Sequence, residues 1–166
     1  MRFLKFRGAR SENDTMAEEK PDPKQLVELS RVRILLVEDS QIDRDVALAS
    51  LRKLGATSVQ VAETGSLALG KIQNALEIRK PFDLILLDAK MPGQDGIAVL
   101  KSLRSQLKTK STPVIMITAS AHSDEVSEFI GMGISGYIVK PFQLEVLKTK
   151  LLEAIAVLKK SSKQAS

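Results

Sequence analysis

Five short apolar runs, separated by longer segments of helical periodicity, constrain the fold of this chain more than any other feature. The runs are Val32 to Val37, Val59 to Ala62, Leu84 to Leu87, Val114 to Ile117 and Tyr137 to Val139. Four of them are apolar at nearly every position, which is typical of parallel strands covered by helices on both faces. The alternation predicts an α/β fold: a doubly wound, five-stranded parallel sheet with about five helices on its two faces.

The intervening segments carry the signals of helix boundaries. Ser40 is a candidate N-cap for a helix that Gly55 would end. A final helix is predicted by apolar residues spaced three and four apart, namely Leu144, Leu147, Leu151, Ile155 and Leu158. We therefore expect a mobile leader over residues 1–30, one domain over residues 31–159 and a polar tail over residues 160–166. Met16 leaves open whether residues 1–15 belong to the natural protein.

Composition excludes several kinds of site. The chain has no Cys and one His, His122, so disulfides, thiolate chemistry and a His-based zinc site are excluded, and we expect His122 to be solvated. The net charge of +5 is concentrated near the C-terminus, where residues 140–166 hold six Lys and two Glu. A uniformly basic nucleic-acid surface is therefore not indicated. No apolar stretch reaches the roughly 20 residues that span a bilayer, and we expect a cytoplasmic protein.

Polar residues follow four of the apolar runs at the point where each strand is expected to end. They are Glu38 and Asp39, Asp88, Thr118 and Lys140. Because the carboxyl ends of parallel strands share one edge, where open α/β folds bind ligands, we expect these residues to form one site.

This combination of side chains indicates phosphoryl chemistry. Carboxylates about 4 Å apart repel by roughly 4 kcal/mol at an effective dielectric near 20, so the three acids predict raised pKa values or a bound cation. Mg²⁺ prefers such oxygen ligands, and a carboxylate can itself attack phosphorus. Lys140 and the Thr118 hydroxyl could then stabilise the phosphoryl oxygens.

At these residues the sequence strongly resembles the receiver domain of two-component response regulators, over about Val32 to Leu158. The matching segments are Leu36-Val37-Glu38-Asp39-Ser40, Asp88-Ala89-Lys90-Met91-Pro92-Gly93-Gln94-Asp95-Gly96, Thr118-Ala119-Ser120 and Tyr137-Ile138-Val139-Lys140-Pro141-Phe142. The resemblance implies the flavodoxin-like strand order 2-1-3-4-5 and, by the family pattern, a cis bond before Pro141.

The resemblance also implies residue roles. Asp88 would be the phosphoacceptor, and Lys140 and Thr118 would contact the phosphoryl group. Glu38, Asp39, Asp88 and the backbone carbonyl of Lys90 would bind Mg²⁺. Thr118 and Tyr137 would form the conformational switch.

As a whole, the resemblance implies a single-domain response regulator of the chemotaxis-regulator type. It would take its phosphoryl group from a histidine kinase or a phosphotransfer protein and signal to a protein partner through helix 4, strand 5 and helix 5. It would promote its own phosphorylation and dephosphorylation without being an enzyme in the usual sense, and we expect neither DNA binding nor membrane insertion. The role of chemotaxis effector, relay intermediate or phosphate sink stays open.

One departure and two alternatives accompany this interpretation. Lys90 stands where many family members have a smaller or neutral side chain, and its ammonium could pair with Glu38 or reach the phosphoryl oxygens. The main alternative is an interaction module that uses the receiver fold without phosphorylation. A phosphohydrolase is disfavoured, because Lys90 occupies the position where such enzymes carry a second Asp.

Overall fold

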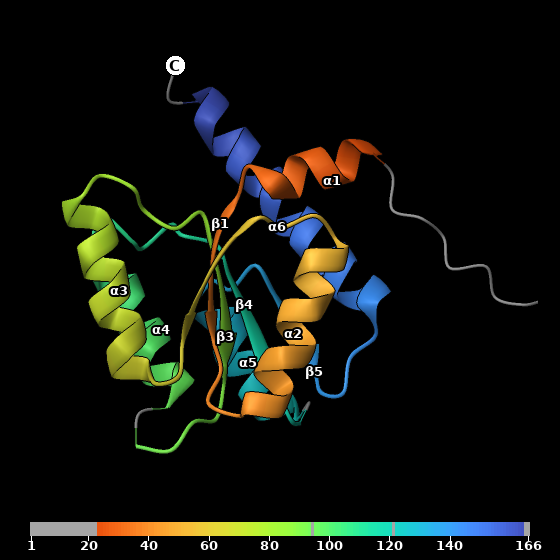
Figure 1. Ribbon diagram of the computed structural model, residues 1–166. Coiled ribbons are helices and arrows are strands. Elements are labelled where there is room, and N and C mark those ends of the chain that lie inside the picture. Colours follow the sequence, from red (N-terminus) through yellow and green to blue (C-terminus); the bar gives the residue numbers. More distant parts are fainter. Residues whose placement is uncertain (1–22, 94, 121, 165–166) are drawn as a thin grey trace, which may run out of the picture.

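The computed structural model describes residues 23–93, 95–120 and 122–164, which form a five-stranded parallel sheet between two layers of helices (Figure 1). The strands are β1 (Arg33–Val37), β2 (Ser58–Ala62), β3 (Leu84–Asp88), β4 (Val114–Thr118) and β5 (Gly136–Val139). Their spatial order is β2-β1-β3-β4-β5, and every neighbouring pair is parallel. The predicted fold class and strand order are confirmed.

In the part of the chain that the structure describes, six helices surround the sheet. They are α1 (Pro23–Ser30), α2 (Gln41–Lys53), α3 (Gly65–Glu77), α4 (Gly96–Ser105), α5 (Ser123–Gly131) and α6 (Leu144–Gln164). Successive residues of a strand point to opposite faces, so β1 contributes Ile34 and Leu36 to one core cluster and Leu35 and Val37 to the other. The first cluster packs against α1, α2 and α6, and the second against α3, α4 and α5.

Side-chain caps set the start of the helices that follow β1 and β3. The Ser40 hydroxyl accepts a hydrogen bond from the Asp43 amide, as predicted for an N-cap, and the Asp95 carboxylate accepts one from the Ile97 amide. Gly55 follows the end of α2 with a φ of 89°, a conformation that glycine adopts without strain. Both caps therefore begin their helices at the carboxyl edge of the sheet.

The expected boundaries of the domain need correction at both ends. Residues 23–30 form helix α1 instead of belonging to a leader, because Leu29 is buried in the core and the Thr57 hydroxyl donates to the Ser30 carbonyl at 2.9 Å. The first 22 residues of the expected leader lie outside the described residues. Helix α6 continues to Gln164, since residues 160–164 include no helix breaker, and Lys159 forms an ion pair with Glu28 of α1.

Among the residues that the structure describes, no helix combines the length and the apolar character needed to cross a membrane.

Candidate functional site

The carboxyl edge of the sheet brings three carboxylates together. Glu38 and Asp39 directly follow β1, and Asp88 is the last residue of the neighbouring strand β3. One carboxylate oxygen from each lies within 4.8 Å of the others. Glu38 and Asp88 are buried, with 1% and 4% of their surface exposed, whereas Asp39 is exposed. Such a set of oxygen ligands, open to solvent on one side, fits Mg²⁺.

Lys140, which directly follows β5, is the cationic centre of this edge. Its ammonium lies 2.7 Å from Glu38, 3.0 Å from Asp43 and 3.2 Å from Asp88. Only 16% of the lysine side chain is exposed, so these pairs are shielded from solvent more than a surface ion pair would be. The peptide bond from Lys140 to Pro141 is cis, as the family resemblance implies.

Two further residues of the edge were not predicted. Asp43 lies in the first turn of α2 and supplies the third carboxylate to Lys140. Arg44 follows it, and its guanidinium donates to the carbonyl oxygens of Glu38 and Asp39, both at 3.2 Å. The sequence signal that could have identified Asp43 and Arg44 was the predicted N-cap at Ser40, because it places the first turn of the helix beside the end of β1.

The pKa values of Glu38 and Lys140 are both raised. Burial disfavours the charged carboxylate of Glu38, and the nearby Asp88 charge adds to this effect, so its pKa rises although Lys140 partly compensates. Burial alone would lower the pKa of Lys140. The hydrogen bonds to Glu38 and Asp43 and the charge of Asp88 outweigh burial, so the pKa of Lys140 lies above its ordinary value.

The raised pKa of Glu38 predicts a pH-dependent gain in stability for Glu38→Gln. Between the ordinary Glu value of 4.5 and the raised value, the folded protein binds more protons at this position than the unfolded chain. Stability is therefore lost as the pH rises through that window. Glutamine does not titrate, so without metal we expect the stability of Glu38→Gln relative to wild type to be higher near pH 8 than near pH 4.

Urea unfolding in the presence of a chelator measures this difference. Asp45→Asn is the matched control, because Asp45 is an exposed carboxylate on α2 and its loss should change the free energy of unfolding by less than about 0.5 kcal/mol. A difference in stability between Glu38→Gln and wild type that is the same at pH 4 and pH 8 would contradict the prediction.

Among the described residues, no hydrogen bond or ion pair joins the acidic cluster to the side chain of either residue predicted to form the switch. Thr118 ends β4 and is fully buried, and its hydroxyl donates to the Ser120 carbonyl at 2.9 Å. Tyr137 lies on the edge strand β5 with 36% of its surface exposed. The backbone amide of Lys140 donates to the Thr118 carbonyl at 2.8 Å, so the two strand ends themselves are joined.

The expected pairing of Lys90 with Glu38 is wrong. The Lys90 ammonium pairs with Glu125 of α5 at 2.9 Å, and Glu38 already has Lys140 as its partner. The backbone amide of Lys90 donates to Asp88 Oδ1 at 3.1 Å, so the residue still touches the edge through its main chain. Coordination of a metal by its carbonyl stays a prediction.

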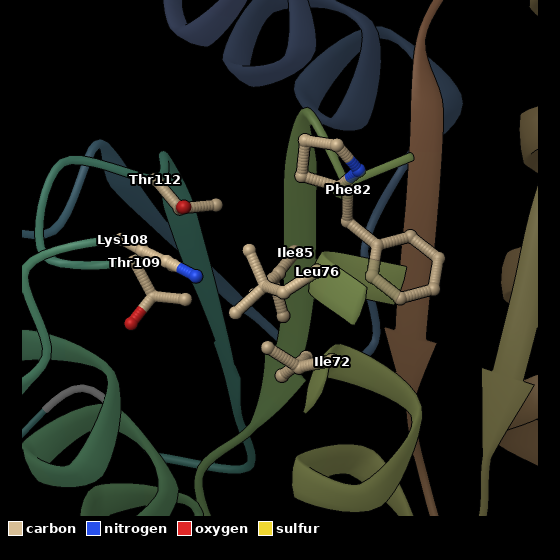
Figure 2. Close-up of a pocket in the computed structure, with 8 residues that line it drawn as sticks. Ile72, Leu76, Phe82, Ile85, Lys108, Thr109 and Thr112 are labelled. Carbon is tan, nitrogen blue, oxygen red and sulfur yellow. The ribbon is translucent and has the colours of Figure 1, made fainter. Parts of the chain in front are cut away.

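A separate pocket lies between α3 and the segment that leads into β4. Its lining is mainly apolar, and Figure 2 shows Ile72, Leu76 and Ile85 beside Thr109 and Thr112. Neither a carboxylate nor any of the predicted site residues lines this pocket. This pocket is therefore separate from the acidic edge of the sheet.

Comparisons with known proteins agree with this geometry. A sequence model described as "response regulator receiver domain" matches residues 34–152. The chemotaxis protein CheY of Pseudomonas aeruginosa is 37% identical over 120 residues, which cover 72% of this chain and 93% of that protein.

Two solved structures are similar over most of their lengths. The chemotaxis protein CheY4 of Vibrio cholerae superposes with a TM-score of 0.66 at 32% identity, covering 74% of this chain and 98% of that chain. The receiver domain of the sensor histidine kinase PA1611 from Pseudomonas aeruginosa has a TM-score of 0.66 at 30% identity, covering 75% and 98%. That structure has a magnesium ion coordinated in the active site cleft.

Proposed function

Because the chain belongs to the response regulator receiver domain family, we propose that Asp88 accepts a phosphoryl group and that the phosphorylated form signals to a protein partner. The observation that carries this proposal is the position of Asp88. Its buried carboxylate lies 3.2 Å from the Lys140 ammonium and beside the carboxylates of Glu38 and Asp39. The donor would be a histidine kinase or a phosphotransfer protein of the cytoplasm.

The proposed transfer exchanges one bond at phosphorus for another. The P–N bond of a phosphohistidine breaks, its electron pair stays on the imidazole, and an oxygen of Asp88 forms the new P–O bond. Lys140 is held within 3.2 Å of Asp88, where it can stabilise the negative charge on the transferred group. Mg²⁺, held by Glu38, Asp39, Asp88 and the Lys90 carbonyl, would supply further positive charge when bound.

The proposed signal is a population shift around Asp88. A phosphoryl group adds negative charge and acceptor oxygens, which favour a conformer that brings the Thr118 hydroxyl close. Tyr137 would then move inward behind Thr118. The expected face of helix 4, strand 5 and helix 5 corresponds here to α5, β5 and α6. It includes a hollow lined by Tyr137, Phe142 and Val146, which supports a protein partner on this face.

Magnesium is expected to stabilise the folded chain. An ion that binds only the folded state adds about 2.7 kcal/mol to the free energy of unfolding when its free concentration is 100 times Kd. Asp39→Asn removes one charged ligand, so its melting temperature should rise less at the same Mg²⁺ concentration. Thermal melts of wild type, Asp39→Asn and the surface control Asp45→Asn check this, and equal shifts in all three would count against the site.

The proposed function is tested by the intact mass of the protein after incubation with acetyl phosphate and Mg²⁺. We expect one labile phosphoryl group per chain, and none when the metal is removed by a chelator. If wild type gains no mass from acetyl phosphate and none from a phosphorylated histidine donor, Asp88 is not an acceptor. The chain would then be a phosphorylation-independent interaction module.

A further inference from the structure

The carboxylate of Glu125 joins two loops at the carboxyl edge of the sheet. Glu125 lies in the first turn of α5. Its Oε1 is 2.9 Å from the ammonium of Lys90, which follows β3, and its Oε2 accepts a hydrogen bond of 2.9 Å from the hydroxyl of Ser120, which follows β4. One side chain therefore contacts both the loop that follows Asp88 and the loop that follows Thr118.

Ser120 in turn holds the Thr118 hydroxyl. Thr118 Oγ1 donates to the Ser120 carbonyl at 2.9 Å, and the Ser120 amide donates back to Thr118 Oγ1 at 3.2 Å. A hydroxyl has a single hydrogen to donate, so Thr118 cannot donate to an oxygen on Asp88 while this bond exists. Any conformer in which Thr118 contacts a phosphoryl group must first break its bond to Ser120.

We propose that Glu125 is a positioning residue that stabilises the resting conformer by holding Ser120, and through it the Thr118 hydroxyl, away from Asp88. The functional consequence of this inference rests on the proposed function. If Asp88 accepts a phosphoryl group, loss of the Glu125 contacts should lower the free-energy cost of the conformer in which Thr118 contacts that group. It differs from the expectation for Lys90, since the lysine here acts through Glu125 and not on the phosphoryl group.

A second ion pair on the same helix differs from that of Glu125 in exposure and in the number of partners. Glu128 pairs with Lys101 of α4 at 3.2 Å, and 47% of the Glu128 side chain is exposed. Glu125 is less exposed, at 29%, and it has two partners on two loops. The hydrogen bonds from Lys90 and then from Ser120 lower the pKa of Glu125, which is consistent with a carboxylate that is well satisfied.

Affinity for beryllium trifluoride, a phosphoryl analogue, measures the cost of leaving the resting conformer. In the presence of Mg²⁺ we expect Glu125→Ala to bind it about two- to five-fold more tightly than wild type, the range that a partly exposed ion pair supports. Glu125→Gln keeps an acceptor for Ser120 but loses the charge facing Lys90, so its affinity should lie between the two. Glu128→Ala removes the same charge from the same helix and should leave the affinity unchanged.

A double-mutant cycle separates an effect that acts through Thr118 from the direct effect of removing a negative charge near the bound anion. Removing a carboxylate near an anion site could strengthen anion binding without any involvement of Thr118. In a Thr118→Val background a positioning effect disappears, whereas a charge effect persists. Equal affinities of Glu125→Ala and wild type, or a gain that persists in Thr118→Val, would overturn the proposal.

The free protein supplies a readout that does not depend on phosphoryl chemistry. The χ1 rotamer of Thr118, measured by NMR couplings to its methyl group, should be redistributed in Glu125→Ala and unchanged in Glu128→Ala. If wild type binds no beryllium trifluoride, that result counts against the proposed function, while this measurement still decides the role of Glu125. An unchanged Thr118 rotamer in Glu125→Ala would contradict that role.

Discussion

Replacing Asp88 by asparagine is expected to abolish phosphoryl transfer from acetyl phosphate completely. The amide has nearly the size and shape of the carboxylate, but its oxygen is a far poorer nucleophile toward phosphorus. Asp88 is also a buried acid, 3.2 Å from Lys140 and beside the carboxylates of Glu38 and Asp39. We therefore expect no gain of intact mass in Asp88→Asn under conditions that label wild type fully.

Asp95→Asn is the matched control for this experiment. Asp95 lies in the same segment between β3 and α4, and it caps α4 through the Ile97 amide. Asparagine caps helices about as well as aspartate, so this variant should fold and be labelled like wild type. Labelling of Asp88→Asn at the wild-type level would place the acceptor on another residue and contradict the proposal.

Gly96→Ala is expected to destabilise the folded protein strongly, although it adds only one methyl group. A Cβ at residue 96 would overlap the carbonyl oxygen of Asp88, and it would lie 2.9 Å from the carbonyl carbon and 3.1 Å from the Ala89 Cα. These atoms belong to the backbone, so no side-chain rotation can relieve the contact. We expect the free energy of unfolding to fall by about 3 kcal/mol, the upper end of typical overpacking costs.

Gly70→Ala provides a control of opposite sign. Gly70 is exposed within α3, and a Cβ there would meet no atom within 4 Å. Alanine is the better helix former, so this variant should gain about 0.5–1 kcal/mol. Urea unfolding of both variants checks the pair. A Gly96→Ala protein as stable as wild type would show that Asp88 and α4 do not approach each other this closely.

Much of the carboxyl edge of the sheet could be predicted because the sequence changes from apolar to polar residues where each strand ends. An apolar run that is buried on both faces cannot continue far into charged residues without burying them, so each strand is expected to end at or close to Glu38, Asp88 or Lys140. Parallel pairing then aligns these ends, whichever helices connect them. For this reason the fold class and the convergence of the three acids with Lys140 could be predicted from local patterns, whereas the strand order came from the family resemblance.

Contacts made by helices across the edge could not be predicted in the same way. Asp43 and Glu125 are ordinary acidic residues in the first turn of a helix, where the helix dipole alone explains them. Only the packing of α2 and α5 beside the strand ends decides that one reaches Lys140 and the other Lys90. The pairing of Lys90 was predicted wrongly because competition between Glu38 and Glu125 depends on distances that sequence does not contain.

Helix α1 was missed for a related reason. A helix of 8 residues is too short to be stable by itself, and the charged sequence before it favoured a leader. Its stability comes from burial of Leu29 and from contacts with residues far along the chain.

The ion pair between Glu28 and Lys159 joins α1 to the end of α6 at the pole of the molecule opposite the acidic edge (Figure 1). Helix α1 and the end of α6 are therefore both remote from the chemistry of the acidic edge. A fluorophore, an affinity tag or a surface tether attached at this pole would leave the acidic edge unobstructed.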